Sequence, residues 1–109
     1  MYEYKVRKVL KVYDGDTITV ELDLGFGIYK KEKIRLSGID TPEIRGEERE
    51  EGLISKYFVD EKLKTANEII IKTFRDRKGK YGRYIGEVII DGSSLNEELL
   101  QLGLAKEYK

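Results

Sequence analysis

The feature that most constrains the fold of this sequence is a run near its start in which apolar and polar residues alternate one by one. Across residues 17–24, Thr, Glu and Asp separate four apolar residues, namely Ile18, Val20, Leu22 and Leu24. A period of two places such side chains on one face of a β-strand. The run therefore predicts a strand with one buried and one exposed face, in a protein built around a sheet.

The segment before this strand predicts a partner for it. Its residues at every second position are mostly apolar: Tyr4, Val6, Lys8, Leu10 and Val12. We expect these side chains on one side of an extended strand, because successive side chains of a strand point to opposite faces. Asp14-Gly15 predicts the turn between the two strands, since glycine readily adopts the positive φ that tight hairpins require.

The remaining elements follow in an order that indicates an OB-fold. Residues 25–27 and 91–92 read as turns, strands are expected at 28–36, 69–74 and 84–90, and a helix at about 50–66. A five-stranded barrel with a helix between strands three and four is the OB-fold arrangement. We therefore expect a mainly β protein with helices (α+β), including a short C-terminal helix, in a single domain over residues 1–109.

The two helices are predicted from their apolar spacing and their ends. The apolar stripe of the longer one is broad and consists of Ile54, Phe58, Val59, Leu63 and Ala66. Ser94 and Glu97 form a capping-box pattern at the start of the short helix, and Gly103 is a stop signal at its end.

The residue types that are missing exclude most common hydrolases. The chain has no Cys and no His, which excludes thiol nucleophiles, imidazole bases and zinc sites made of these residues. An enzyme built on it has to use carboxylates, Arg, Lys, Tyr, hydroxyl groups and a hard metal ion that prefers oxygen ligands. Lys plus Arg and Asp plus Glu both number 21, so the formal net charge is zero, unlike that of a globally basic nucleic-acid binder.

Neither a membrane span nor a secretory signal is indicated. No apolar run approaches the roughly 20 residues that a membrane helix requires. The first residues, Met-Tyr-Glu-Tyr-Lys, lack the apolar stretch of a secretory signal. We expect a cytoplasmic protein with no membrane partner, or a secreted one only if the chain is a processed form.

The first of three candidate motifs is Asp14-Gly15-Asp16-Thr17. Its two carboxylates stand two residues apart beside a turn, so they can converge on a cation. The alternative is a plain Asp-Gly hairpin turn, and this tetrapeptide alone favours that alternative.

The second motif is residues 35–43, Arg-Leu-Ser-Gly-Ile-Asp-Thr-Pro-Glu. It puts the guanidinium of Arg35 at a strand end and the carboxylates of Asp40 and Glu43 around a rigid Thr41-Pro42 bond. Proline restrains the residue before it and fixes its own φ, which would hold a carbonyl or carboxylate in place. Taken singly, each residue also has a simpler interpretation as a turn residue, a solvated acid or an ordinary ion pair.

The third motif is Lys80-Tyr81-Gly82-Arg83, in which a cation and a phenol flank a flexible glycine. On its own it is an ordinary exposed turn.

Together and in this order, the three motifs resemble those of the staphylococcal nuclease family, and the resemblance continues to residues 102–106, Leu-Gly-Leu-Ala-Lys. It implies a Ca²⁺-dependent phosphodiesterase on an OB-fold. The implied metal ligands are Asp16, Asp40 and the backbone carbonyl of Thr41, supported through water by Asp14. The implied catalytic residues are Glu43 as general base or water-positioning group and Arg35 and Arg83 as phosphate ligands. The implied substrate contacts are Tyr81 and Lys80.

The chemistry of phosphodiester hydrolysis fits these residues. Negative charge builds on the phosphate oxygens as water attacks, and two arginines can meet it with forked hydrogen bonds. A bound dication adds Lewis-acid stabilisation, and oxygen ligands in a flexible loop suit Ca²⁺ better than Mg²⁺. In a chain without His, a carboxylate such as Glu43 is the natural group to activate water.

Two departures from the family pattern concern the substrate. Residues 45–51, Arg-Gly-Glu-Glu-Arg-Glu-Glu, stand where the family usually carries lysines, and this acidic loop would repel a polyanion. A second substrate tyrosine of the family falls one position out of register with Tyr108, which is therefore given no role.

The leading hypothesis is a nuclease that cleaves single-stranded DNA or RNA with little sequence preference, as a monomer, to 5′-hydroxyl and 3′-phosphate products. One alternative is a non-catalytic OB-type module that binds nucleic acid or a protein, supported by the neutral charge and eight tyrosines. A further alternative is an enzyme for a smaller phosphodiester, such as a nucleotide.

Overall fold

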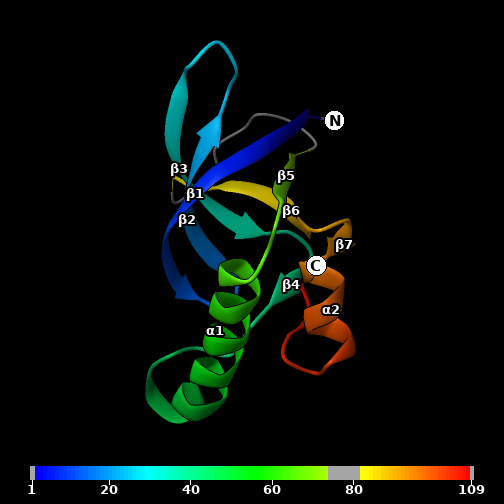
Figure 1. The fold of residues 1–109 in the computed structure, drawn as a ribbon. Coiled ribbons are helices and arrows are strands. Elements are labelled where there is room, and N and C mark those ends of the chain that lie inside the picture. Colours follow the sequence, from blue (N-terminus) through cyan, green and yellow to red (C-terminus); the bar gives the residue numbers. More distant parts are fainter. Residues whose placement is uncertain (1, 74–81, 109) are drawn as a thin grey trace.

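In the part of the chain that the structure describes, five strands close into a barrel (Figure 1). The computed structural model of the protein describes residues 2–73 and 82–108. The barrel strands are β1 (Tyr2–Asp14), β2 (Thr17–Asp23), β3 (Tyr29–Leu36), β5 (Ile69–Thr73) and β6 (Tyr84–Ile90). β1 pairs antiparallel with both β2 and β5, and a parallel pairing of β3 with β6 closes the barrel.

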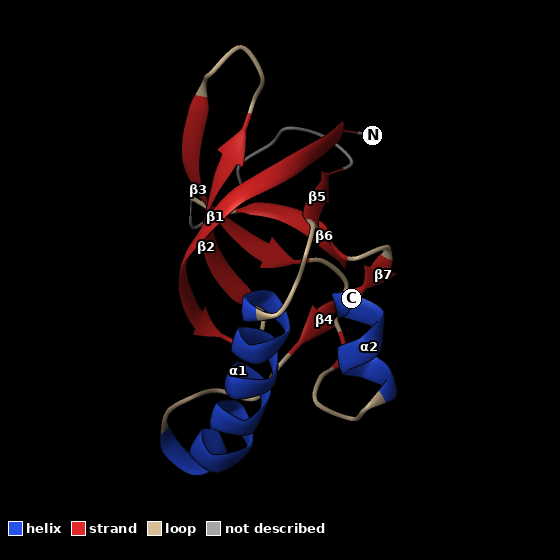
Figure 2. Cartoon of the chain, in the orientation of Figure 1, coloured by secondary structure: helices blue, strands red, loops and turns tan. Residues whose placement is uncertain are grey.

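Two helices pack beside the barrel (Figure 2). A 3₁₀ turn, η1 (Gly46–Glu48), leads into α1 (Arg49–Lys64), and α2 (Leu95–Gln101) follows the last barrel strand. Three short strands complete the structure: β4 (Ile39–Asp40), β7 (Ser93–Ser94) and β8 (Lys106–Glu107). Because α1 separates the third and fourth barrel strands in the chain, the predicted OB-fold is confirmed. Neither helix in the described ranges has the length and apolarity to cross a membrane.

The inner face of β2 is the one that the alternating pattern predicts. Ile18, Val20 and Leu22 are buried in the barrel core. Leu24, in contrast, is 40% exposed, so its predicted burial is wrong. The strand ends at Asp23, and the chain then turns back, with the N–H of Leu24 donating to the carbonyl of Ile28 at 2.9 Å.

β1 does not alternate as predicted, because its register against β2 shifts at three places spaced three residues apart. Each such bulge sets two residues of β1 against one of β2, so the inward positions recur every three residues instead of every two. Val6, Val9 and Val12 consequently pack on the core. Lys8 and Leu10, both expected on the same side of the strand as Val6 and Val12, are exposed.

The face that α1 buries also differs from the predicted stripe. Val59 and Leu63 are buried as expected, but Ile54 is 58% exposed. Near the helix start the buried residues are Gly52 and Ser55. This end of the helix lies directly against the backbone of the preceding loop, which leaves no room for larger side chains.

α2 begins and ends as the sequence predicts. The Oγ of Ser94 accepts a hydrogen bond from the N–H of Glu97 at 3.2 Å, which caps the helix. Gly103, with a φ of 72°, follows the last turn.

A buried amide ties α2 to the barrel. The Oδ1 of Asn96 accepts a hydrogen bond from the N–H of Val88 in β6 at 3.0 Å, and its Nδ2 donates to the carbonyl of Ser37 at 2.9 Å. Because Ser37 lies within the second motif, α2 helps to position that motif.

Candidate active site

The predicted site residues converge where three segments meet: the β1–β2 turn, the segment that follows β3, and the first turns of α1. Asp14 and Asp16 come from the turn and Thr41 from the segment after β3, and each of the three is 8% exposed or less. The backbone N–H of Thr41 donates to the carboxylate of Asp16 at 3.1 Å, across 25 residues of sequence. The fold therefore joins the first two motifs directly.

Glycine permits this packing at two positions. A Cβ on Gly15 would lie 2.8 Å from Thr41 Cγ2 and 2.9 Å from Ser55 Cβ, and a Cβ on Gly52 would lie 2.1 Å from the backbone oxygen of Glu43. The expected positive φ at Gly15 is wrong, since the positive-φ glycines are others. This position requires glycine because two neighbouring side chains occupy the space that a Cβ would need.

The carboxylate of Asp16 is held from several directions. Its Oδ1 accepts a hydrogen bond from the Thr17 hydroxyl at 3.0 Å, and its Oδ2 lies 3.6 Å from Arg35 Nη2. The same nitrogen lies 3.3 Å from Oδ1 of Asp40. Arg35 Nη1 donates to two nearby backbone carbonyls at 2.7 and 3.0 Å, which fixes the guanidinium. One cationic group thus faces both predicted carboxylate ligands.

The two aspartates of the turn have pKa values shifted in opposite directions. Burial, followed by the hydrogen bond and the charge of Asp16, raises the pKa of Asp14 to about 7. Burial also opposes ionisation of Asp16, but hydrogen bonds from Asp14 and Thr41 and the charge of Arg35 outweigh it, so the pKa of Asp16 lies below its usual value. Below pH 7, Asp16 is therefore the ionised member of the pair.

The second predicted phosphate ligand lies next to the first. Arg83 Nη1 is 3.3 Å from the Oγ1 of Thr17, the residue that pairs across the β2–β3 ladder with Arg35. Arg35 and Arg83 are thus both neighbours of Thr17, Arg35 through strand pairing and Arg83 through its side chain. The predicted substrate contacts Tyr81 and Lys80 lie outside the described residues.

Glu43 lies at the edge of an acidic groove. Its side chain is exposed, and its backbone N–H donates to the carboxylate of Glu48 at 3.3 Å. The groove has a volume of about 240 Å³, and its walls include Asp40, Glu51 and Lys106. Four carboxylates and one ammonium therefore border this space, which favours cations over a polyanion.

Tyr108, to which the sequence assigned no role, lies next to the site. Its ring centroid lies 5.0 Å from the guanidinium carbon of Arg35, and its backbone N–H donates to the carbonyl of Gly38 at 3.0 Å. The pairing of β4 with β8 brings this C-terminal segment alongside the site. Nothing in the local sequence around Tyr108 indicates this pairing, because it joins two strands of two residues each.

The donor groups that meet here fit a hard cation that completes its coordination with water. Within residues 2–73 and 82–108, no three His, Cys, Asp or Glu side chains gather closely enough to hold a metal by themselves. Asp16 and Asp40 nevertheless face one common positive group. Thr41 Oγ1 is buried beside them and has no hydrogen-bond partner among these residues. All the available donors are oxygen atoms, as Ca²⁺ and Mg²⁺ prefer.

The sequence matches known proteins over most of its length. The family model described as staphylococcal nuclease homologue matches residues 33–109. An uncharacterized protein of Methanocaldococcus jannaschii, MJ1439, is 34% identical over 98% of this chain and 61% of its own length. The thermonuclease of Staphylococcus hyicus is 31% identical over 91% of this chain and 57% of its own length. The endonuclease YncB of Bacillus subtilis is 33% identical over 88% of this chain and 44% of its own length.

These matches and the structure agree. The chain spans between 44% and 61% of the length of these three relatives. The matched region of the family model includes Arg35, Asp40, Glu43 and Arg83, and the closed barrel is the fold that the motifs implied. The chain belongs to the family of staphylococcal nuclease homologues.

Proposed function

We propose that this protein is a Ca²⁺-dependent nuclease that hydrolyses single-stranded DNA or RNA to 5′-hydroxyl and 3′-phosphate products. One observation carries the proposal: the guanidinium of Arg35 lies within 3.6 Å of carboxylate oxygens of both Asp16 and Asp40, and Arg83 borders the same site. Buried oxygen donors beside two arginines suit a cation and a phosphate diester at once.

In this proposal the site residues divide the work of hydrolysis. Asp16, Asp40 and the carbonyl of Thr41 would hold Ca²⁺, which supplies Lewis-acid stabilisation of the phosphate when bound. Arg35 and Arg83 donate hydrogen bonds to the phosphate oxygens as negative charge develops on them.

Glu43 takes the proton of the attacking water in the same reaction. The water oxygen bonds to phosphorus and the P–O5′ bond breaks. The leaving oxygen takes up a proton from solvent to become the 5′-hydroxyl, and Glu43 returns its proton to solvent. The phosphate stays on the 3′ oxygen. The exposure of Glu43 at the edge of the groove leaves its carboxylate accessible to this water.

The test is digestion of single-stranded DNA with Ca²⁺ or with a chelator, using the parent protein and the Glu43→Gln and Arg35→Ala variants. Cleavage should require Ca²⁺, and each variant should lose on the order of 10²–10³ in rate, as enzymes do when one charge-stabilising group is removed. Glu47→Gln, in the same acidic loop but outside the site, is the matched control and should retain the parent rate.

Two results would contradict the proposal. Equal, negligible cleavage by every protein would instead favour the non-catalytic binding module. Cleavage that survives in chelator and in both site variants would show that another site or another protein is responsible.

A further inference from the structure

A cationic face extends from the candidate active site across the outer side of β1, β2 and β3. Cross-strand partners on one face of an antiparallel sheet lie about 5 Å apart, so the register of the strands shows which outer side chains are neighbours. The first row contains Asp14, Thr17 and Arg35, which belong to the site. The next row contains Lys11, Thr19 and Lys33, and the row after it contains Lys8, Glu21 and Lys31.

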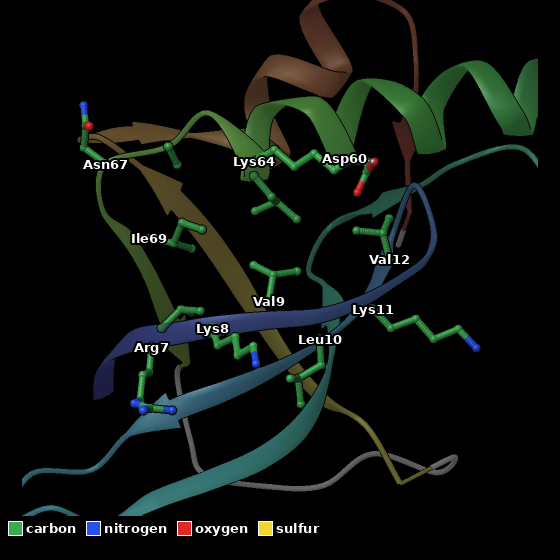
Figure 3. Close-up of a pocket in the computed structure, with 13 residues that line it drawn as sticks. Arg7, Lys8, Val9, Leu10, Lys11, Val12, Asp60, Lys64, Asn67 and Ile69 are labelled. Atoms are coloured by element: carbon green, nitrogen blue, oxygen red, sulfur yellow. Dashed lines mark ion pairs between the residues drawn. The ribbon is translucent and has the colours of Figure 1, made fainter.

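The bulges of β1 aim its lysines at this face. All four of Lys8, Val9, Lys11 and Val12 line the cavity of about 500 Å³ between β1 and α1. In Figure 3, Val9 and Val12 point toward α1, whereas the ammonium ends of Lys8 and Lys11 extend away from it. Lys31 and Lys33 are exposed at the corresponding positions of β3. The lysines of β1 and β3 therefore flank β2 from both sides.

These four lysines, at positions 8, 11, 31 and 33, are the positive groups of this face, and the Nζ of Lys11 lies 5.7 Å from the ring centroid of Tyr13. None of them forms an ion pair with a carboxylate within the described part of the chain. The one acid between them, Glu21, is paired with Arg7. In a protein with zero net charge, the face thus holds a local excess of positive charge.

The spacing of the rows matches a polynucleotide strand. Consecutive rows are two residues apart along β3, which is about 6.8 Å in an antiparallel strand. That distance is close to the separation of successive phosphates in an extended strand. Thr19, the residue of β2 in the same row as Lys11 and Lys33, is uncharged.

We propose that these four lysines (the lysine face) bind the phosphates that flank the scissile one in a single-stranded polynucleotide. Lys11 and Lys33 contact the first phosphate beyond the site, and Lys8 and Lys31 contact the second. This inference rests on the proposed function for the identity of the scissile phosphate. It also gives the substrate a route away from the acidic loop at residues 45–51.

The test measures the binding of fluorescein-labelled (dT)₁₂ to the cleavage-deficient Glu43→Gln protein. Fluorescence anisotropy gives the association constant K at NaCl concentrations between 50 and 200 mM. In that background, Lys11→Gln/Lys33→Gln should make the slope of log K against log salt shallower by about 0.7, the value for one lost phosphate contact in a single strand. The matched control is Lys62→Gln/Lys64→Gln on α1, which changes the net charge equally and should leave the slope unchanged.

A second measurement uses proteins that retain Glu43. With the lysine pair replaced, kcat/KM for (dT)₁₂ should fall several-fold, while kcat/KM for the dinucleotide dTpdT, which has no flanking phosphate, should equal that of the parent. If the Lys11→Gln/Lys33→Gln variant has the same salt slope as the Lys62→Gln/Lys64→Gln control, the proposal that the lysine face binds phosphates is wrong. If the lysine replacements make the slope shallower but the protein that retains Glu43 cleaves neither substrate, the lysine face is supported as a binding surface. In that case the proposed nuclease activity is rejected.

Discussion

At the scale of single residues, the site depends on side chains that are absent as much as on those that are present. Gly15 and Gly52 both stand where a Cβ would overlap a neighbouring segment, at 2.8 Å and 2.1 Å from the nearest atoms. Neither position is polar, and neither would be selected by a search for catalytic groups. Their effect is to let the β1–β2 turn, the Asp-Thr-Pro-Glu segment and α1 approach one another, which brings Asp16 to Thr41.

The first prediction concerns Gly52→Ala. The added methyl group must displace the backbone at Glu43, so the free energy of unfolding should fall by about 1–3 kcal/mol, as overpacked sites do. Activity should fall further than stability explains, because the segment that moves carries Glu43. Urea denaturation and cleavage assays measure both effects. Ile54→Ala on the exposed side of the same helix is the control, and an equal loss in both variants would contradict the packing argument.

The second prediction concerns the pH dependence of stability without metal. The folded protein holds the proton of Asp14 up to a pKa of about 7, against an ordinary value of 3.8. The unfolded chain binds fewer protons between these values, so this contribution is present below pH 3.8 and is lost as the pH rises toward 7. The Asp14→Asn variant has no titrating carboxyl at this position, so its stability does not include this pH-dependent contribution. Urea denaturation in chelator should show the variant gaining stability relative to the parent between pH 5 and pH 8, and a constant difference would contradict the assignment.

At the scale of elements, the sequence predicted the five barrel strands and the two helices, but it did not predict which faces β1 and α1 bury. The strict alternation of residues 17–24 identified β2 and its inner face, apart from Leu24 at its end. The bulges of β1 arise from its pairing with β2. The only sign of them in the sequence of β1 itself is the three-residue spacing of Val6, Val9 and Val12. In α1, Gly52 and Ser55 form part of the buried face, and an apolar pattern does not include such small residues.

The third prediction concerns the attachment of α2. Asn96→Ala removes the acceptor of the buried Val88 N–H and the donor to the Ser37 carbonyl, so the free energy of unfolding should fall by roughly 1–3 kcal/mol. Asn67→Ala, at an exposed asparagine, should change stability by less than about 0.5 kcal/mol. Equal denaturant midpoints for the two variants would show that the buried amide does not secure the helix.

At the scale of the whole molecule, the fold unites groups that lie far apart in the sequence. Arg83 and Thr17 are 66 residues apart and lie 3.3 Å from each other because β3 and β6 close the barrel. The motif order and the resemblance predicted this gathering of Asp16, Arg35, Asp40 and Arg83. Tyr108 was not predicted, since it reaches Arg35 through a two-residue pairing that leaves no periodic signal.

The fourth prediction concerns metal and global stability. Ca²⁺ that binds only the folded protein should stabilise it by about 2.7 kcal/mol at a concentration 100 times its dissociation constant. Asp16→Asn and Asp40→Asn should remove most of this stabilisation, because each loses a predicted ligand. Calorimetry of calcium binding and thermal unfolding with and without Ca²⁺ measure the effect. Unchanged calcium affinity in Asp40→Asn would show that the ligand is wrongly assigned.

The three-residue spacing of β1 has a consequence for how this protein can vary. A regular strand offers one outward side chain for every inward one, but β1 offers two outward side chains for each core valine. Along the same length of chain, β1 therefore has twice as many surface positions that can be substituted as core positions. Positions 7, 8, 10 and 11 can therefore be replaced while the hydrophobic interior keeps its sequence.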